Sequence, residues 1–223
     1  MNRPQVRAIE NPSPDLGFNY ANLGSGLQIH RIHNGKFGPT EFNPGAAIDI
    51  KNGKIGSRFA PFRSGGRYIP TLYGGASLGC AAFETIFHDI APDARFKTVS
   101  MSQISALHYS VIELVRDIQV TKLFSADLKK LSLARGELID CPASSYSTTR
   151  PWAQAIYEAP GSSAGMMWMS RQFDEDRAYM FFGDHQVAPL FDTVTSVSII
   201  NDAAALEAVR ELGERAGITI VHS

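Results

Sequence analysis

The sequence lacks the marks of several large protein classes. It contains 2 cysteines in 223 residues, too few for the disulfide framework that supports small secreted domains. No apolar run reaches the roughly 18 residues of a membrane-spanning helix, and the N-terminus shows no apolar signal segment. We therefore expect a cytoplasmic protein that does not bind membranes.

An excess of charge of one sign is also lacking. The chain has 21 Lys and Arg against 22 Asp and Glu, a formal net charge of −1. This balance argues against a direct nucleic-acid binder and against an acidic tail protein. Neither G-x-G-x-x-G nor Walker A sequences occur, so the standard nucleotide loops are excluded. Hydrophobic residues make up 44% of the chain and include 13 Phe, which is enough for an aromatic-rich core.

The hydrophobic pattern predicts strands and helices that do not alternate regularly. Strands are predicted at 27–33, 68–73, on either side of residues 116–117 within 106–124, at 166–169, 179–182 and 218–221. Helices are predicted from Ser77 to about Asp89, over 128–133 and from Asp202 to Gly217. Another helix is predicted to begin within residues 148–151, with Pro151 in its first turn. An α+β fold is therefore expected, with an N-terminal arm over 1–28 and one domain over 29–223.

Two motifs match known sites only in part. Residues 161–165 fit the G-x-S-x-G pattern of serine hydrolases, but that pattern needs a strand before it and a helix after it. Here the order is reversed, so Ser163 is interpreted as part of a turn and not as a nucleophile. His30 and His33 would point to opposite faces of a strand. Without a third ligand they do not predict a metal site.

The informative segment runs from Arg58 to His88. It contains, in order, the pair Arg58-Phe59, a turn at Gly65-Gly66, a strand ending in Tyr73 and a helix carrying Glu84; Ser170 follows a later short strand. In this order of features the chain resembles the RES domain family, the toxin half of bacterial RES–Xre toxin–antitoxin pairs, over roughly residues 29–185. It departs from the family at Gly74-Gly75, where a less flexible pair is expected.

The resemblance implies a fold and an activity. RES toxins are similar in fold to ADP-ribosyltransferases, with mixed or antiparallel sheets and flanking helices. They use NAD+ as a substrate, and the family therefore implies no resident cofactor and no metal ion. Members degrade NAD+ by hydrolysis or phosphorolysis, and others transfer ADP-ribose to a protein. The implied partner is an Xre-type antitoxin, and DNA would be contacted only through this antitoxin. The implied assembly is a homo-oligomer of the toxin or a toxin–antitoxin hetero-oligomer.

The residues that carry the resemblance suit this chemistry. Cleavage of the nicotinamide–ribose bond develops positive charge on the ribose, which the Glu84 carboxylate would stabilise. Arg58, or Arg31 as second candidate, would bind the diphosphate through its guanidinium fork. Tyr73 would stack on the positively charged nicotinamide ring. Ser170 would hydrogen-bond the substrate or hold Glu84 or Arg58 in place.

Other functions stay open at this point. A transferase that modifies a protein with ADP-ribose would use the same NAD+ pocket. A degenerate RES fold would act only as a binding module, although the retained Arg, Tyr, Glu and Ser argue against it. A serine hydrolase is disfavoured by the context of its motif. His88 is interpreted as a residue of the helix surface and Trp168 as a core residue.

Overall fold

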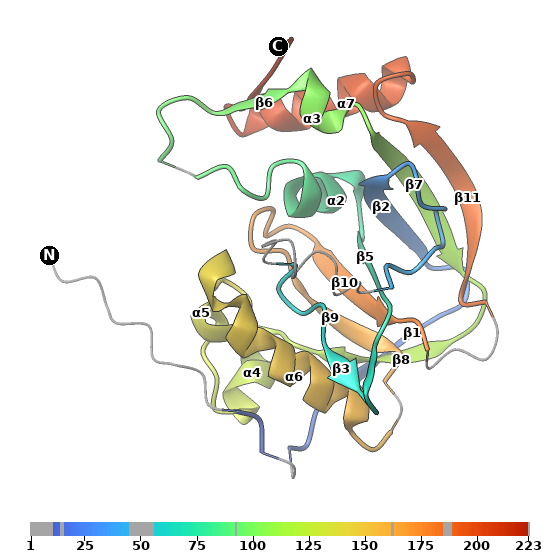
Figure 1. The fold of residues 1–223 in the computed structure, drawn as a ribbon, viewed down its shortest axis with the longest axis vertical. Helices are drawn as coiled ribbons and strands as arrows, with labels where there is room; N and C mark the ends of the chain where they lie inside the picture. The colour runs from blue at the N-terminus through green and yellow to red at the C-terminus, as the bar shows by residue number, and fades with distance from the viewer. Residues whose placement is uncertain are drawn as a thin grey trace, which may run out of the picture.

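The structure is a computed structural model that describes residues 11–13, 16–44, 56–91, 93–161, 163–184 and 189–222. Its centre is an eight-stranded sheet in the order β1-β8-β9-β10-β5-β2-β7-β11 (Figure 1). The strands are β1 (Tyr20–Leu23), β2 (Gln28–Asn34), β5 (Thr71–Gly75), β7 (Leu107–Leu114), β8 (Ile118–Lys122), β9 (Gly165–Met169), β10 (Arg177–Phe182) and β11 (Phe191–Ser198). Within this sheet β8 and β9 are parallel and the other neighbours are antiparallel. The expected α+β class is confirmed.

Helices flank the sheet in two groups (Figure 1). One group contains α4 (Ser125–Lys130), α5 (Arg135–Leu138) and α6 (Tyr146–Glu158); the other contains α2 (Leu78–Thr85), α3 (Met101–Ile104) and α7 (Ala203–Arg215). A short 3-10 helix, η1 (Ala143–Ser145), leads into α6. Two small sheets pair β3 (Arg63–Ser64) with β4 (Arg67–Tyr68) and β6 (Thr98–Ser100) with β12 (Thr219–Val221). None of the described helices is long and apolar enough to cross a membrane.

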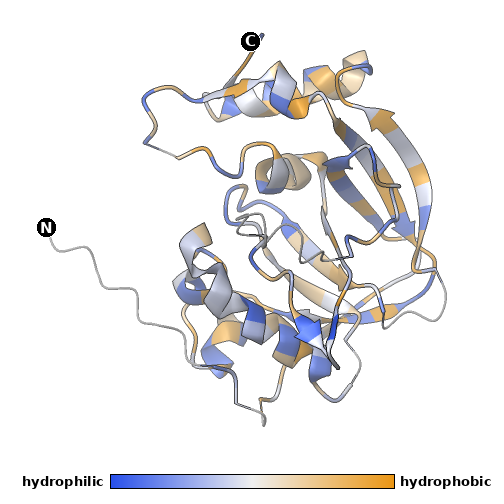
Figure 2. Cartoon of the chain, in the orientation of Figure 1, coloured by the Kyte–Doolittle hydropathy of each residue, from blue (hydrophilic) through white to orange (hydrophobic). Residues whose placement is uncertain are grey.

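The middle of the sheet is buried on both faces. Along β9, Met166 and Trp168 pack into the core beneath α6, whereas Met167 packs into a second core on the opposite face. The alternation follows from the two-residue period of a strand. Because both faces are covered, β9 and β10 read as continuous apolar runs. Toward the edge of the sheet, β7 and β11 carry both hydrophobic and hydrophilic residues (Figure 2).

Several element boundaries differ from the sequence expectation. Helix α2 is capped by Ser77, whose Oγ accepts from the Cys80 amide at 3.1 Å, but it ends at Thr85 and not near Asp89. The helix expected over 128–133 is α4, which lies three residues earlier. Pro151 lies in the interior of α6 because this helix begins at Tyr146.

Two strand assignments also change. The strand expected over 68–73 is divided at Pro70, which has no N–H for a sheet ladder, and only its second half enters the main sheet as β5. The last part of the expected N-terminal arm forms β1, whose Tyr20 pairs with Thr121 of β8. Strand β1 and the opposite edge, β11, were not predicted.

Candidate active site

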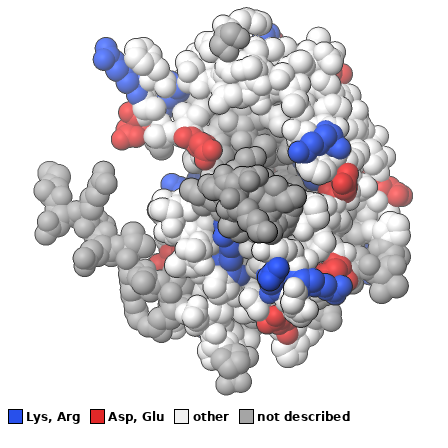
Figure 3. All heavy atoms as spheres, viewed as in Figure 1, with Lys and Arg blue, Asp and Glu red and all other residues white. Residues whose placement is uncertain are grey.

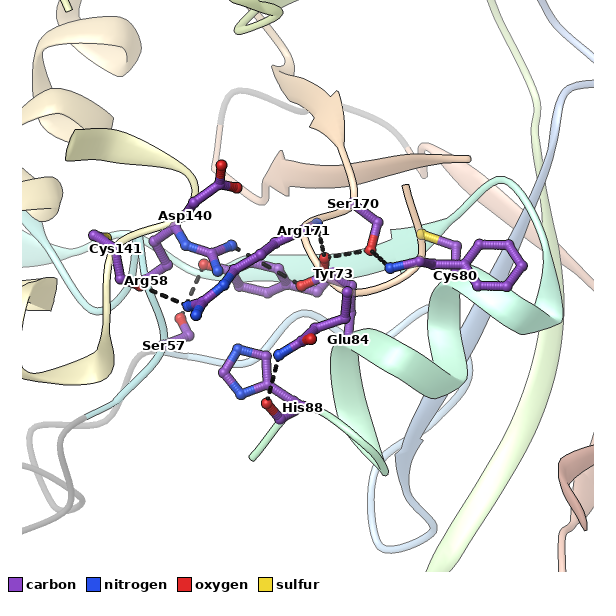
Figure 4. A network of polar contacts seen from close by, with 12 residues as sticks. Ser57, Arg58, Tyr73, Cys80, Glu84, His88, Asp140, Cys141, Ser170 and Arg171 are labelled. Atoms are coloured by element: carbon purple, nitrogen blue, oxygen red, sulfur yellow. Dashed lines mark hydrogen bonds and ion pairs between the residues drawn. The ribbon is translucent and has the colours of Figure 1, made fainter. Parts of the chain in front are cut away.

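Four of the five candidate residues surround or adjoin one cavity. The cavity has a volume of about 570 Å³, which is within the range of small-molecule sites. Arg58, Tyr73 and Glu84 line it, together with Tyr146, Trp168 and His88 among others. Ser170 adjoins the cavity through its hydrogen bond to the Glu84 carboxylate (Figure 4). These residues belong to β5, α2, α6 and β9, to the segments that follow α2 and β9, and to the segment that precedes β3.

The Glu84 carboxylate is held by donors from two sides. Oε1 accepts hydrogen bonds from Ser170 Oγ at 2.7 Å and from the Arg171 backbone amide at 3.3 Å. Oε2 lies 3.9 Å from Arg58 Nη1, and the carboxylate side chain is 17% exposed. Glu84 therefore presents a fixed negative charge to the cavity, as stabilisation of a cationic centre requires.

Ser170 acts on Glu84 from a buried turn. It follows β9, and its backbone N–H donates to the Asp176 carbonyl at 3.0 Å across the turn into β10. Its Oγ accepts from the Phe173 amide at 3.2 Å, so the hydroxyl proton is directed to Glu84. Of the two roles that the sequence left open, this geometry favours holding Glu84 in place.

Arg58 is a buried cation with unused donors. Its side chain is 4% exposed, and Nε and Nη2 have no hydrogen-bond partner among the described residues. Its guanidinium lies 5.7 Å from the centre of the Tyr146 ring. The Thr149 hydroxyl donates to the Arg58 carbonyl and fixes the backbone. Buried donors without partners are costly, and an anionic ligand in the cavity would remove that cost.

Tyr73 forms another wall of the cavity. Its hydroxyl lies 2.9 Å from Ser57 Oγ, and burial raises the pKa of its phenol to about 12. The ring stands edge-on to Trp168 with 6.5 Å between centroids. Tyr73 is therefore neutral at physiological pH and presents an aromatic surface to a ligand.

Arg31 is not brought together with the other four. It precedes Ile32, which lines the cavity, and adjacent residues of a strand point to opposite faces. Its Nη1 donates to the Pro39 carbonyl at 2.6 Å and lies 3.4 Å from the Gly38 carbonyl. Burial lowers its pKa to about 10. In this structure Arg31 holds the turn after β2.

Sequence reasoning missed two cavity residues, Tyr146 and His88. The Tyr146 hydroxyl lies 3.3 Å from His88 Nε2, and burial raises the pKa of Tyr146. His88 was interpreted as a surface residue, but it lines the cavity and is 23% exposed. Its signal in the sequence was its position four residues after Glu84. Tyr146 begins a segment that resembles the helix lead-in of the RES family, but its place in the cavity depends on the tertiary fold, which brings α6 to the site.

The glycine pair after Tyr73 has a packing reason. A Cβ on Gly74 would lie 2.4 Å from Ile29 Cγ2, and one on Gly75 would lie 2.7 Å from Cys80 Cβ. The pair lets β5 approach both β2 and the first turn of α2. This close approach accounts for the departure from the family pattern.

The motifs set aside in the sequence lie elsewhere. Ser163 is buried, and its hydroxyl donates to the Gly165 carbonyl at 2.6 Å. Within the part of the chain that the structure describes, no group of three or more His, Cys, Asp or Glu residues could hold a metal ion. On the face shown in Figure 3, basic and acidic side chains are interspersed.

Comparison with known proteins decides the family. The model of the RES domain matches residues 28–201. The chain belongs to the RES domain family. A chain in the crystal structure of the Mycobacterium tuberculosis MbcT–MbcA toxin–antitoxin complex is similar to this RES domain in fold, with a TM-score of 0.59 and 12% sequence identity over 85% of this chain and 92% of that chain. No curated protein matches the sequence significantly.

Proposed function

We propose that this RES-domain protein is the toxin of a toxin–antitoxin pair and that it cleaves the nicotinamide–ribose bond of NAD+. One observation carries the proposal. In the cavity, the buried Arg58 guanidinium lies beside the Glu84 carboxylate and has two nitrogens that no described residue hydrogen-bonds. A ligand that carries both an anionic group and a developing cation fits this pair, and NAD+ does so during cleavage.

Each residue then has a defined task. Arg58 binds the diphosphate with its unpaired nitrogens, and Tyr73 stacks on the nicotinamide ring. When the N-glycosidic bond breaks, its electron pair leaves with nicotinamide, which becomes neutral. The ribose carbon C1′ becomes cationic beside Glu84, which Ser170 and the Arg171 amide hold in place. A neutral leaving group needs no second carboxylate acid, unlike that of most glycosidases.

The antitoxin partner is the second part of the proposal. Membership of the RES family and the fold shared with a chain of a toxin–antitoxin complex support a protein partner. The Xre type follows from the family resemblance. A partner that covers the cavity would block NAD+ entry, and inhibition by the co-expressed partner is the direct check.

The test follows the fate of NAD+ labelled in its ADP-ribose part, with purified protein in the presence and absence of phosphate. We expect free nicotinamide together with labelled ADP-ribose or its phosphate ester. A phosphate requirement would identify phosphorolysis. Label found only on added cellular protein would establish a protein ADP-ribosyltransferase in place of a NAD+-degrading enzyme. Unchanged NAD+ in every arm, with a folded sample, would contradict the proposal.

A further inference from the structure

We propose that His88 is the general base that takes the proton of the acceptor in NAD+ cleavage, with Asp89 as its positioning residue and Tyr146 as the partner of its free nitrogen until the acceptor binds. The inference rests on the proposed function and deepens it, since it names the group that activates the water or phosphate. His88 lines the cavity that contains Glu84 and Arg58.

The backbone around His88 is fixed although α2 has already ended. Gln172 Nε2 donates to the His88 carbonyl at 3.0 Å, so the turn that carries the imidazole is tied to the loop after β9. That loop also supplies Ser170 and the Arg171 amide to Glu84. The loop after β9 therefore contacts both Glu84 and the turn that carries His88, and it holds the carboxylate and the imidazole at the same cavity.

The hydrogen bonds of the ring define which nitrogen is free to accept a proton. Nδ1 lies 2.8 Å from Asp89 Oδ1, and a carboxylate accepts, so Nδ1 carries the hydrogen. Nε2 then carries the lone pair and lies 3.3 Å from the Tyr146 hydroxyl. This distance exceeds the roughly 2.8 Å typical of hydroxyl donors, so an acceptor molecule can replace Tyr146 as the partner of Nε2.

His88 suits proton removal better than Glu84 does. Glu84 Oε1 already accepts two hydrogen bonds, and Oε2 faces the Arg58 guanidinium. Among the described residues, Nε2 of His88 has one long contact, with the Tyr146 hydroxyl. The imidazole is 23% exposed, and it can therefore pass its proton on to solvent after each turnover.

Charged and titratable groups surround His88 on several elements. Asp89 is its neighbour in the same turn, and Glu84 is on α2. Tyr146 approaches from α6 with the Arg58 cation behind its ring. Arg171 comes from the loop after β9, with Nη1 bonded to the Cys141 carbonyl at 3.1 Å. Acidic groups next to an imidazole favour its protonated form and basic groups oppose it.

The step balances in atoms and electrons. The bond between nicotinamide N1 and ribose C1′ breaks, and both electrons leave with nicotinamide. The acceptor oxygen forms the new bond to C1′, and its proton passes to His88 Nε2 and then to solvent. For water the sum is NAD+ plus H2O to nicotinamide, ADP-ribose and one proton. No oxidant, reductant or metal is consumed.

The test compares His88→Asn with wild type and with the matched control His222→Asn, whose histidine is exposed near the C-terminus. NAD+ turnover is measured from pH 5 to pH 9, with and without azide. Wild type and the control should lose activity at the acidic end of this range, where a general base is protonated. His88→Asn should be about 100-fold slower in water and should not show that acidic loss. Azide carries no proton to remove, so it should restore most of the rate by forming azido-ADP-ribose.

A second variant lies at an exposed position. Asp89 is 96% exposed, and Asp89→Asn replaces the carboxylate that accepts from Nδ1 of His88. It should lower kcat with KM unchanged, because the imidazole is held less firmly in the orientation that accepts the proton. A merely structural residue would not lower kcat alone.

The outcomes separate this inference from the proposed function. If Glu84→Gln is inactive while His88→Asn keeps the wild-type rate and pH profile, His88 is not the base and only the inference fails. The same holds if His88→Asn is slow and azide does not rescue it. If wild type consumes no NAD+ at all, both proposals fail.

Discussion

At the scale of single residues, the site depends on the Ser170 hydroxyl, which holds the Glu84 carboxylate in place. Ser170 Oγ links the Phe173 amide to Glu84 Oε1, and it has no access to solvent. Ser170→Ala should lower kcat/KM for NAD+ by about 10- to 100-fold, because a hydrogen bond to a charged group contributes about 1.5–3 kcal/mol. Steady-state kinetics check this, with Ser105→Ala as the control at an exposed serine. An unchanged kcat/KM would show that Glu84 does not depend on Ser170.

A second residue, His33, predicts a pH dependence of stability. Burial, aided by the nearby Arg31 cation, lowers the pKa of His33 from 6.5 to about 4. Between these values the unfolded chain binds a proton that the folded chain does not, so stability is present above pH 6.5 and is lost as the pH falls toward 4. The loss should be about 2 kcal/mol after partial solvent screening is allowed for.

Denaturant unfolding at a series of pH values checks this dependence. His33→Asn should flatten the slope of unfolding free energy against pH between 6.5 and 4, whatever its effect at neutral pH. The exposed His222→Asn should leave the slope unchanged. A slope in His33→Asn equal to that of wild type would contradict the assignment.

The candidate site could be predicted from the sequence where residues follow one another in a recognisable order. Arg58, Tyr73 and Glu84 lie within 27 positions, and Ser170 follows a strand that its apolar run reveals. Tyr146 and the cavity position of His88 could not be predicted, because they depend on how α6 packs across the end of α2. Arg31 was placed by residue type alone, and strand alternation directs it away from the cavity.

At the scale of elements, close packing of β5 against α2 sets the position of Glu84. Gly75→Ala would place a Cβ 2.7 Å from Cys80 Cβ, and overpacking of this kind costs about 1–3 kcal/mol. We expect a lower melting temperature and reduced turnover, since α2 must shift. Gly136→Ala in α5 is the matched control, because a Cβ there meets nothing within 4 Å and alanine favours a helix. Equal stability of the two variants, measured by thermal unfolding, would contradict this packing argument.

Elements were predictable where burial gives a strong periodic signal. Both strands β9 and β10 and the capped helix α7 begin and end near the expected residues. Strands β1 and β11 were missed because they form the two edges of the sheet. Five successive residues of β11 are exposed, so the strand lacks the clear alternation of a half-buried strand. Helix α2 ends early, and its last turn continues into the bend that carries His88.

At the scale of the whole molecule, the strand order assembles the site. Strand β10 lies between β5 and β9, so Tyr73 and Trp168 face one another from strands far apart in the sequence. Ser170 reaches Glu84 across 86 positions of the chain. Local sequence patterns do not determine such an order. The fold class could therefore be predicted, whereas the sheet order came only with the structure.

Ligand binding should stabilise the molecule through this site. Glu84→Gln, which is expected to bind NAD+ without cleaving it, should melt about 5–10 °C higher when NAD+ is present at about 100 times its dissociation constant. The additional substitution Arg58→Ala should remove most of this shift, because the buried guanidinium is the proposed partner of the diphosphate. Differential scanning calorimetry measures both. A full shift without Arg58 would place the diphosphate elsewhere.

The central claim is that the cavity cleaves NAD+ and that Glu84 stabilises the cationic ribose. Its most direct test is the rate of nicotinamide release from NAD+ by the purified chain beside Glu84→Gln, with equal melting temperatures as proof of folding. The account predicts steady release by wild type and a loss of at least about 100-fold in Glu84→Gln. Equal rates in the two proteins, or no release by folded wild type, would contradict it.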